Sequence, residues 1–292
     1  MAVDRECDPS PGGPPQVEEP LIDAALLAFD LAPLLCTASE CVAYHRLWPW
    51  LRVLGLASSP ERHREFFSKQ LRPAARTDRR IDVLVSGCAD QAMLAHVAAS
   101  VANARVTVVD KCGTPLALCD SYARRREALD LQLVEGDIRD VGVGPFDLIT
   151  THSFLSQFRP DERPELISAW LRLLAPDGRV VTTTRLEPTA STDTFADDAV
   201  HDFGARVLAG AHAHDDPRVR GHAETLGAVA EDYARTLRVH SVATVEELEH
   251  LFREAGFGKV SVTSRRMEGM PTGRAGPTMR RAADYAEIVA VP

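Results

Sequence analysis

Three residues that follow short β-branched runs have the side chains and spacing of a nucleoside-binding site. Gly87 ends the segment VLVSG, and Asp110 closes the later run VTVVD. A glycine lets a ligand approach the backbone, and a carboxylate at a strand tip accepts hydrogen bonds from two ribose hydroxyls. The carboxylate of Asp137, in EGDIRD, is suited to accept a hydrogen bond from an adenine amino group. Two alternatives stay open, because a strand–Gly–helix turn occurs in many folds that bind nothing and Asp110 could cap the next helix in competition with Thr114.

These residues stand at the ends of predicted strands. The apolar runs that predict strands are 81–85, 105–109, 131–134, 146–151 and 179–184. The helical segments between them are about 90–102, 114–128 and 162–174. Such alternation is typical of βαβ units and a parallel sheet. Since ligands of these sheets bind beyond the carboxyl ends of the strands, the three residues are expected in one crevice.

The remaining segments flank or interrupt this α/β pattern. Residues 1–19 are rich in Pro, Gly and acidic side chains and are predicted to form a disordered tail. Apolar residues at helical spacing predict a helical cap over 20–80 and a helical insertion over 186–242. The α/β domain therefore spans 81–292. It ends with a helix at 244–255 and two strands, 258–264 and 285–291, that suggest a hairpin with a long loop.

Taken together, the elements resemble the class I S-adenosylmethionine (SAM)-dependent methyltransferases. The resemblance covers roughly 81–185 and 243–292, and it includes the helix end LLAPDG and the run TVEELEHLFREAGF. It implies a doubly wound, Rossmann-like, mostly parallel seven-stranded sheet with an N-terminal helical cap. It also implies SAM as the cofactor and S-adenosylhomocysteine (SAH) as the product.

The resemblance assigns roles to individual residues. The methionine part of SAM would lie at Ser86, Gly87 and Cys88, the ribose at Asp110 and Lys111, and the adenine at Asp137 and Ile138. The turn before strand five is formed by Leu174, Pro176, Asp177 and Gly178, and Thr151 lies beside the same cleft after strand four.

The first glycine motif departs from the family pattern. This chain has Val85, Ala89 and Gln91 where the family has an acid and later glycines. Asp90 is our candidate for the missing carboxylate near the SAM amino group. A turn without three glycines also disfavours a dinucleotide, because the backbone approaches a pyrophosphate less easily.

The candidates for work on the acceptor lie outside these motifs. Methyl transfer mainly needs alignment and exclusion of water, and a general base is optional. His152 is the candidate base, since its ordinary pKa suits proton acceptance at neutral pH, although a histidine there is as often structural. The residues predicted to contact the acceptor are Tyr44, His45, Trp48, Arg52, Phe154 and Phe203. The aromatic stripe among them has a core role as its alternative.

Composition narrows the other possibilities. A formal charge of -9 and a pI near 5.6 oppose binding to nucleic acid, which needs a basic surface. Six cysteines without C-x-x-C spacing favour a reducing compartment, and no metal site is expected. His201, His212, His214 and His222 lack an H-E-x-x-H pattern. No apolar run reaches membrane-spanning length and no signal peptide is recognised, so we expect a cytoplasmic protein without a membrane partner.

The sequence therefore predicts an enzyme that methylates an O, N or C nucleophile of a small-molecule metabolite, such as one of specialised metabolism. Two alternatives remain: a non-catalytic SAM- or nucleoside-binding protein, and, less favoured, an NAD-type oxidoreductase. A homo-oligomer is compatible with the sequence, which carries no signal for oligomeric state.

Overall fold

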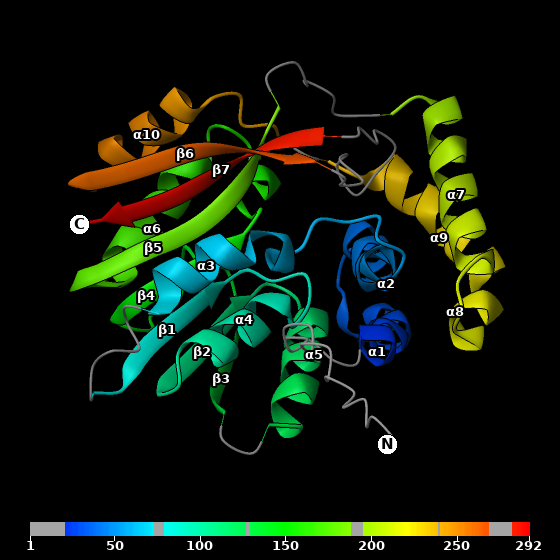
Figure 1. Cartoon of the computed structure of the whole chain (residues 1–292), viewed down its shortest axis with the longest axis horizontal. Helices are drawn as coiled ribbons and strands as arrows, with labels where there is room; N and C mark the ends of the chain where they lie inside the picture. The colour runs from blue at the N-terminus through cyan, green and yellow to red at the C-terminus, as the bar shows by residue number, and fades with distance from the viewer. Residues whose placement is uncertain (1–20, 73–78, 127–128, 188–194, 239, 269–281) are drawn as a thin grey trace, which may run out of the picture.

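A seven-stranded sheet forms the centre of the molecule (Figure 1). The computed structural model describes residues 21–72, 79–126, 129–187, 195–238, 240–268 and 282–292, and the predicted tail at 1–19 lies outside them. The parallel strands are β1 Ile81–Ser86, β2 Ala104–Asp110, β3 Asp130–Glu135, β4 Phe146–His152 and β5 Leu174–Leu186.

Two C-terminal strands extend the sheet in the antiparallel sense. β7 (Ala282–Val291) pairs with β5, and β6 (Lys259–Glu268) pairs with β7, so that the strand order is β3-β2-β1-β4-β5-β7-β6. The prediction of a doubly wound, mostly parallel seven-stranded sheet is confirmed. Because β1 lies between β2 and β4, the strand order reverses there, and a ligand crevice is expected at the ends of these strands.

The predicted turn before strand five is a disruption within β5. Leu174 pairs with Phe146 and Arg179 with Leu148, so residues 175–178 bulge out of the ladder. Gly178 is required there, because a Cβ atom would stand 2.7 Å from the carbonyl oxygen of Phe146. The bulge lets the chain leave the preceding helix and enter the sheet within a few residues.

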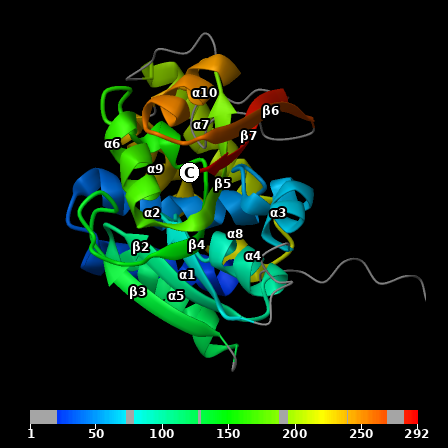
Figure 2. The same cartoon turned by 90° about the vertical axis from the view of Figure 1, so that its left-hand side faces the viewer.

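Helices cover both faces of the sheet, since successive side chains of a strand point to opposite sides. Val83 packs toward α3 (Arg64–Leu71), α4 (Ala92–Ser100) and α5 (Gly113–Arg124). Leu84 packs toward α6 (Arg163–Leu173) and α10 (Val245–Glu254). Figure 2 shows α6 and the pair α3 and α4 on opposite sides of β4 and β5.

The remaining helices gather at the end of the sheet toward which β1 to β5 point (Figure 1). The N-terminal region supplies α1 (Leu21–Leu35), α2 (Ser39–Val53) and the 3-10 helix η1 (Pro60–His63). The segment after β5 supplies α7 (Asp197–His212), α8 (Pro217–Gly221) and α9 (Ala223–Thr236). Trp50 of α2 and Phe203 of α7 share a third apolar core. Helices thus occupy both ranges predicted as cap and insertion, and none of the described helices has the length and apolarity to span a membrane.

One buried arginine fastens the chain where it returns from α9 to the sheet. Arg163 of α6 is fully buried and donates to a carboxylate oxygen of Glu247 at 2.8 Å. It also donates to the carbonyl oxygens of His240 (2.9 Å) and Ser241 (2.8 Å). Thr244 caps α10 by accepting from the Glu247 backbone N–H, so the arginine and the cap position the same glutamate.

Replacing Arg163 by Met should lower the free energy of unfolding by about 2–3 kcal/mol, because a partly buried carboxylate and two carbonyl groups lose their donor. Urea unfolding followed by circular dichroism measures the change. Arg172→Met is the matched control on the same helix, since the exposed Arg172 donates only to carbonyl groups at the surface. A change below about 1 kcal/mol for Arg163→Met would contradict the anchoring role.

Candidate functional site

A cavity of about 310 Å³ lies at the carboxyl ends of the parallel strands. Its walls come from the turn after β1, from β2, β4 and β5, from α2, and from the segment around Tyr233 of α9. Tyr285 of the antiparallel strand β7 closes another side. The predicted site residues that line it are Tyr44, His45, Trp48, Arg52, Gly87, Cys88, Asp90, Asp110, Phe154 and the candidate base His152.

The turn after β1 is built around Gly87. Its φ of +70° lies in the left-handed region that favours glycine, and its N–H donates to the carbonyl oxygen of Val109 at 2.8 Å. A Cβ atom at this position would stand 2.2 Å from the ring of Phe154. The glycine therefore permits both the turn and the close packing of Phe154 against it.

Asp110 joins the turns that follow two neighbouring strands. One carboxylate oxygen accepts from the backbone N–H of Cys88 at 2.9 Å, and the other accepts from that of Cys112 at 2.9 Å. Burial raises the pKa of Asp110 to about 6, while these two backbone donors act to lower it. Each oxygen retains a lone pair, so the carboxylate can still accept bonds from a ligand hydroxyl.

A second cavity, of about 210 Å³, adjoins the first along the same edge of the sheet. Lys111, Asp137 and Ile138 line it, and Asp110 and Phe154 line both cavities. The three cofactor elements predicted after β1, β2 and β3 therefore converge on one continuous stretch of the surface.

Asp137 carries two cationic partners in this second cavity. Arg139 donates to its carboxylate at 2.7 Å and Lys111 at 2.6 Å. The bond from Arg139, together with that from Lys111, holds the pKa of Asp137 well below its usual range. The carboxylate is thus ionised at neutral pH and can accept a hydrogen bond from an amino group.

Two predicted residues, Arg52 and Asp90, form a buried ion pair on the wall of the larger cavity. The guanidinium Nη1 stands 2.6 Å from one carboxylate oxygen, and the side chains are 5% and 4% exposed. The other oxygen of Asp90 accepts from the backbone N–H of Ala92 at 2.9 Å, at the start of α4. The pair links the cap helix α2 to the turn after β1.

His152 lies at the end of β4 with both ring nitrogens in hydrogen bonds. Nδ1 is 2.7 Å from the hydroxyl of Thr183, and Nε2 is 3.1 Å from that of Ser58. Burial, with His63 and Arg52 nearby, holds the pKa of His152 well below its usual value. The ring is therefore neutral at pH 7 and has a nitrogen able to accept a proton.

The predicted aromatic stripe lies partly on the cavity wall. The ring of Tyr44 is 5.3 Å from Trp48 and 6.0 Å from Tyr233, centroid to centroid. Burial raises the pKa of both Tyr44 and Tyr233, so the phenols stay protonated. The two predicted roles of the stripe, contact with the acceptor and packing in the core, are therefore compatible. These rings pack on the helical core and also line the cavity.

Three predicted site residues lie outside both cavity walls. Ser86 is fully buried, and its hydroxyl accepts from the indole N–H of Trp170 at 2.8 Å. The buried hydroxyl of Thr151 donates to the carbonyl oxygen of Gly87 at 3.4 Å. Phe203 is fully buried, its ring 6.2 Å from that of Tyr233, because its apolar face packs into the core shared by α2, α7 and α9.

The cavity also contains polar residues that the sequence analysis missed. These are Ser58, Ser156, Gln157, Arg185, Glu187, Tyr233, Ser241 and Tyr285. Arg185 and Glu187 follow the predicted strand at 179–184, so the rule about carboxyl ends of strands could have found them. Tyr285 carried no such signal, because it lies on an antiparallel strand.

Residues 83–178 match the family model described as a methyltransferase domain. The matched stretch contains Gly87, Asp110 and Asp137 and ends at Gly178. Over these residues the chain is similar to a methyltransferase domain, as the resemblance found in the sequence predicts.

The solved structures that are similar to this chain are distant from it in sequence. The SAM-dependent methyltransferase SibL, in its apo form, is 15% identical with a TM-score of 0.50, covering 91% of this chain and 62% of that one. PigF with SAH is 16% identical (TM-score 0.44, coverage 84% and 66%), and a putative O-methyltransferase from Nostoc punctiforme is 16% identical (TM-score 0.47, coverage 92% and 70%). The chain spans less than two thirds of the first two. No curated protein matches it.

Ser86→Ala should lower the free energy of unfolding by about 1–3 kcal/mol, because it leaves the buried indole N–H of Trp170 without an acceptor. Chemical unfolding measures this loss. In the double variant Ser86→Ala/Trp170→Phe the two losses should be less than additive. Strict additivity would show that the hydrogen bond contributes nothing.

The depressed pKa of His152 should make stability depend on pH. The unfolded chain takes up a proton near pH 6.5 while the folded histidine does not, so this residue's contribution falls as pH drops below that value. Comparing His152→Gln with wild type between pH 5.5 and 7.5 isolates the effect. When the pH falls from 7.5 to 5.5, the free energy of unfolding of the wild type should drop by up to about 1.4 kcal/mol more than that of the variant. Parallel pH curves would contradict a neutral buried ring.

Proposed function

We propose that this protein transfers a methyl group from SAM to a nucleophilic atom of a small molecule. The observation that carries the proposal is the convergence of the Gly87 turn, Asp110 and Asp137 on two adjoining cavities at one sheet edge. A nucleoside with an amino-acid tail needs such an elongated site, with carboxylate acceptors at separate points along it.

The chain's residues fit the parts of SAM in the order expected from the sequence. Asp137 and Ile138 would hold the adenine, Asp110 with Lys111 the ribose, and Gly87 with Cys88 the methionine part. SAM supplies a methyl group already activated by its sulfonium. The remaining work of the protein is to orient the acceptor and exclude water.

The shape and chemistry of the larger cavity support a small acceptor. Helices α2 and α9 and strand β7 surround it, and its volume is in the range that holds small ligands. Arg185, which lines the cavity, has buried Nε and Nη1 atoms without a hydrogen-bond partner among the described residues. Its Nη2 pairs with Glu187 at 2.6 Å, so the local charge is balanced. A neutral group of the substrate, such as a carbonyl oxygen, would accept hydrogen bonds from the Nε and Nη1 atoms of Arg185.

His152 would take the proton when the acceptor atom carries one. Its neutral ring lines the cavity, and Nε2 lies beside the hydroxyl of Ser58, a position that a substrate hydroxyl could share. Thr183 holds the opposite nitrogen and so fixes the ring. His152→Ala should lower turnover at saturating SAM by about 100-fold. Retention of nearly full rate would mean that the ring only positions the acceptor.

Calorimetric titration with SAM tests the cofactor assignment. Asp110→Asn should weaken binding by at least about 10-fold, because the carboxylate's bonds to hydroxyls are charge-assisted. Asp120→Asn is the matched control, since Asp120 pairs with Arg124 at the surface of α5. Equal affinities for both variants would contradict the role of Asp110.

Ligand-dependent melting and turnover separate this function from the alternatives. SAM and SAH should raise the melting temperature and NAD should not. Formation of SAH with a panel of small acceptors distinguishes an enzyme from a SAM-binding protein without activity. The proposal also includes a cytoplasmic location, which the six cysteines without C-x-x-C spacing support. It includes no role for nucleic acid, which the net charge of -9 supports.

A further inference from the structure

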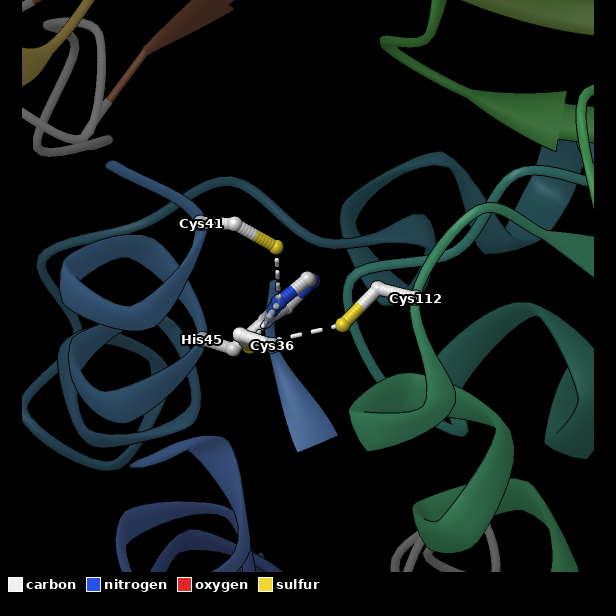
Figure 3. Close-up of side chains that lie close together, drawn as sticks. All are labelled: Cys36, Cys41, His45 and Cys112. Carbon is white, nitrogen blue, oxygen red and sulfur yellow. Dashed lines mark hydrogen bonds between the residues drawn. The ribbon is translucent and has the colours of Figure 1, made fainter. Parts of the chain in front are cut away.

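Three cysteines and a histidine meet beside the cofactor edge, although no short sequence motif joins them. Figure 3 shows Cys36, Cys41, His45 and Cys112 directed toward a common centre. One possible ligand atom from each residue lies within 4.8 Å of all the others. His45 and Cys112 are buried and the other two are half-buried, so the cluster is shielded but still reachable by an ion.

The spacing of these atoms is that of the ligand shell of one ion. The Cys36 sulfur is 3.4 Å from both His45 Nδ1 and the Cys112 sulfur, and the Cys41 sulfur is 3.3 Å from His45 Nδ1. Zinc–sulfur bonds of about 2.3 Å and zinc–nitrogen bonds of about 2.0–2.1 Å place tetrahedral ligands about 3.6–3.8 Å apart. These three distances would lengthen by a few tenths of an ångström on binding an ion, and separations of up to 4.8 Å among the four atoms would shorten by about 1 Å.

Three separate elements supply the ligands. Cys36 follows the last residue of α1, and Cys41 and His45 lie four residues apart on α2, which places them on one face of that helix. Cys112 comes from the opposite side, where it stands at the N-cap of α5. The cluster thus joins the N-terminal helices to the α/β domain.

One hydroxyl outside the ligand set can stabilise a thiolate, which is the form of cysteine that binds metal. The hydroxyl of Thr114 lies 3.3 Å from the Cys36 sulfur, where it can donate to a thiolate. Partners outside the ligand set are typical of built metal sites.

We propose that Cys36, Cys41, His45 and Cys112 bind a single Zn²⁺ ion in a closed, structural site. Three thiolates and an imidazole form one of the ligand sets of tetrahedral structural zinc, with no position left for water. The ligand atoms lie within 4.8 Å of one another, so the most widely separated of them would have to approach by about 1 Å to bind one tetrahedral zinc ion.

The site would stabilise the cofactor edge through the backbone. The N–H of Cys112 donates to the carboxylate of Asp110, so an ion that fixes Cys112 also fixes this acid. The ion would at the same time hold α1 and α2 against the turn after β2. The zinc site does not depend on the proposed methyl transfer, and it would stand if that activity were absent.

Metal content of the full-length protein tests the proposal. After expression with zinc and dialysis against metal-free buffer, elemental analysis should find about one zinc per chain. Cobalt substituted into the site should show thiolate-to-cobalt charge transfer and the d–d bands of tetrahedral coordination. A wild-type protein that is metal-free and takes up neither ion from one equivalent overturns the proposal. So does a Cys36–Cys112 disulfide found in most of the isolated protein by peptide mass spectrometry.

Variants locate the ion. Competition with a chromophoric chelator should show zinc affinity lowered by more than about 100-fold in Cys41→Ser and by about 10–100-fold in Thr114→Val, which loses only the hydroxyl near Cys36. Cys119→Ala, the control, removes a buried thiol outside the cluster and should keep wild-type affinity. Far-UV circular dichroism confirms that each variant is folded. Unchanged affinity in folded Cys41→Ser and Thr114→Val would place the ion elsewhere and reject the site.

Discussion

The carboxylate of Asp110 is the interaction on which the site depends. Its two oxygens receive the backbone N–H groups of Cys88 and Cys112, so one side chain sets the separation of the turns after β1 and β2. Those turns carry the methionine and ribose ends of the proposed ligand site, and the second of them carries a ligand of the proposed zinc ion. A single half-buried acid therefore aligns the two turns with each other.

The helices outside the sheet convert an open edge into an enclosed space. Ligands of a doubly wound sheet bind beyond the strand ends, which are exposed unless other segments cover them. Here α2 and α9 share an apolar core, so the two covering segments support each other as well as the cavity. The ion pair between Arg52 and Asp90 then ties this cover to the turn beneath it.

Much of this arrangement was predictable, because alternation of strands and helices fixes the sheet type and the sheet type fixes where its ligands bind. Because ligands bind beyond the carboxyl ends of parallel strands, Gly87, Asp110 and His152 were expected beside the crevice, and all three line the larger cavity. Helical spacing could not decide whether an apolar face meets a ligand or another helix, and Phe203 meets the core. The sequence could not predict the cysteine cluster, since Cys112 meets the other three residues only through the packing of α1 against α5.

The position of Phe154 couples the two cavities. Its ring packs on Gly87 and forms part of both walls, so a shift of this one side chain changes both volumes together. A compound that binds in the first cavity and favours one orientation of the Phe154 ring would change the affinity of the second cavity for its own ligand. Thermodynamic linkage makes this influence equal in both directions. Cooperativity between two occupants would thus need no movement of the backbone.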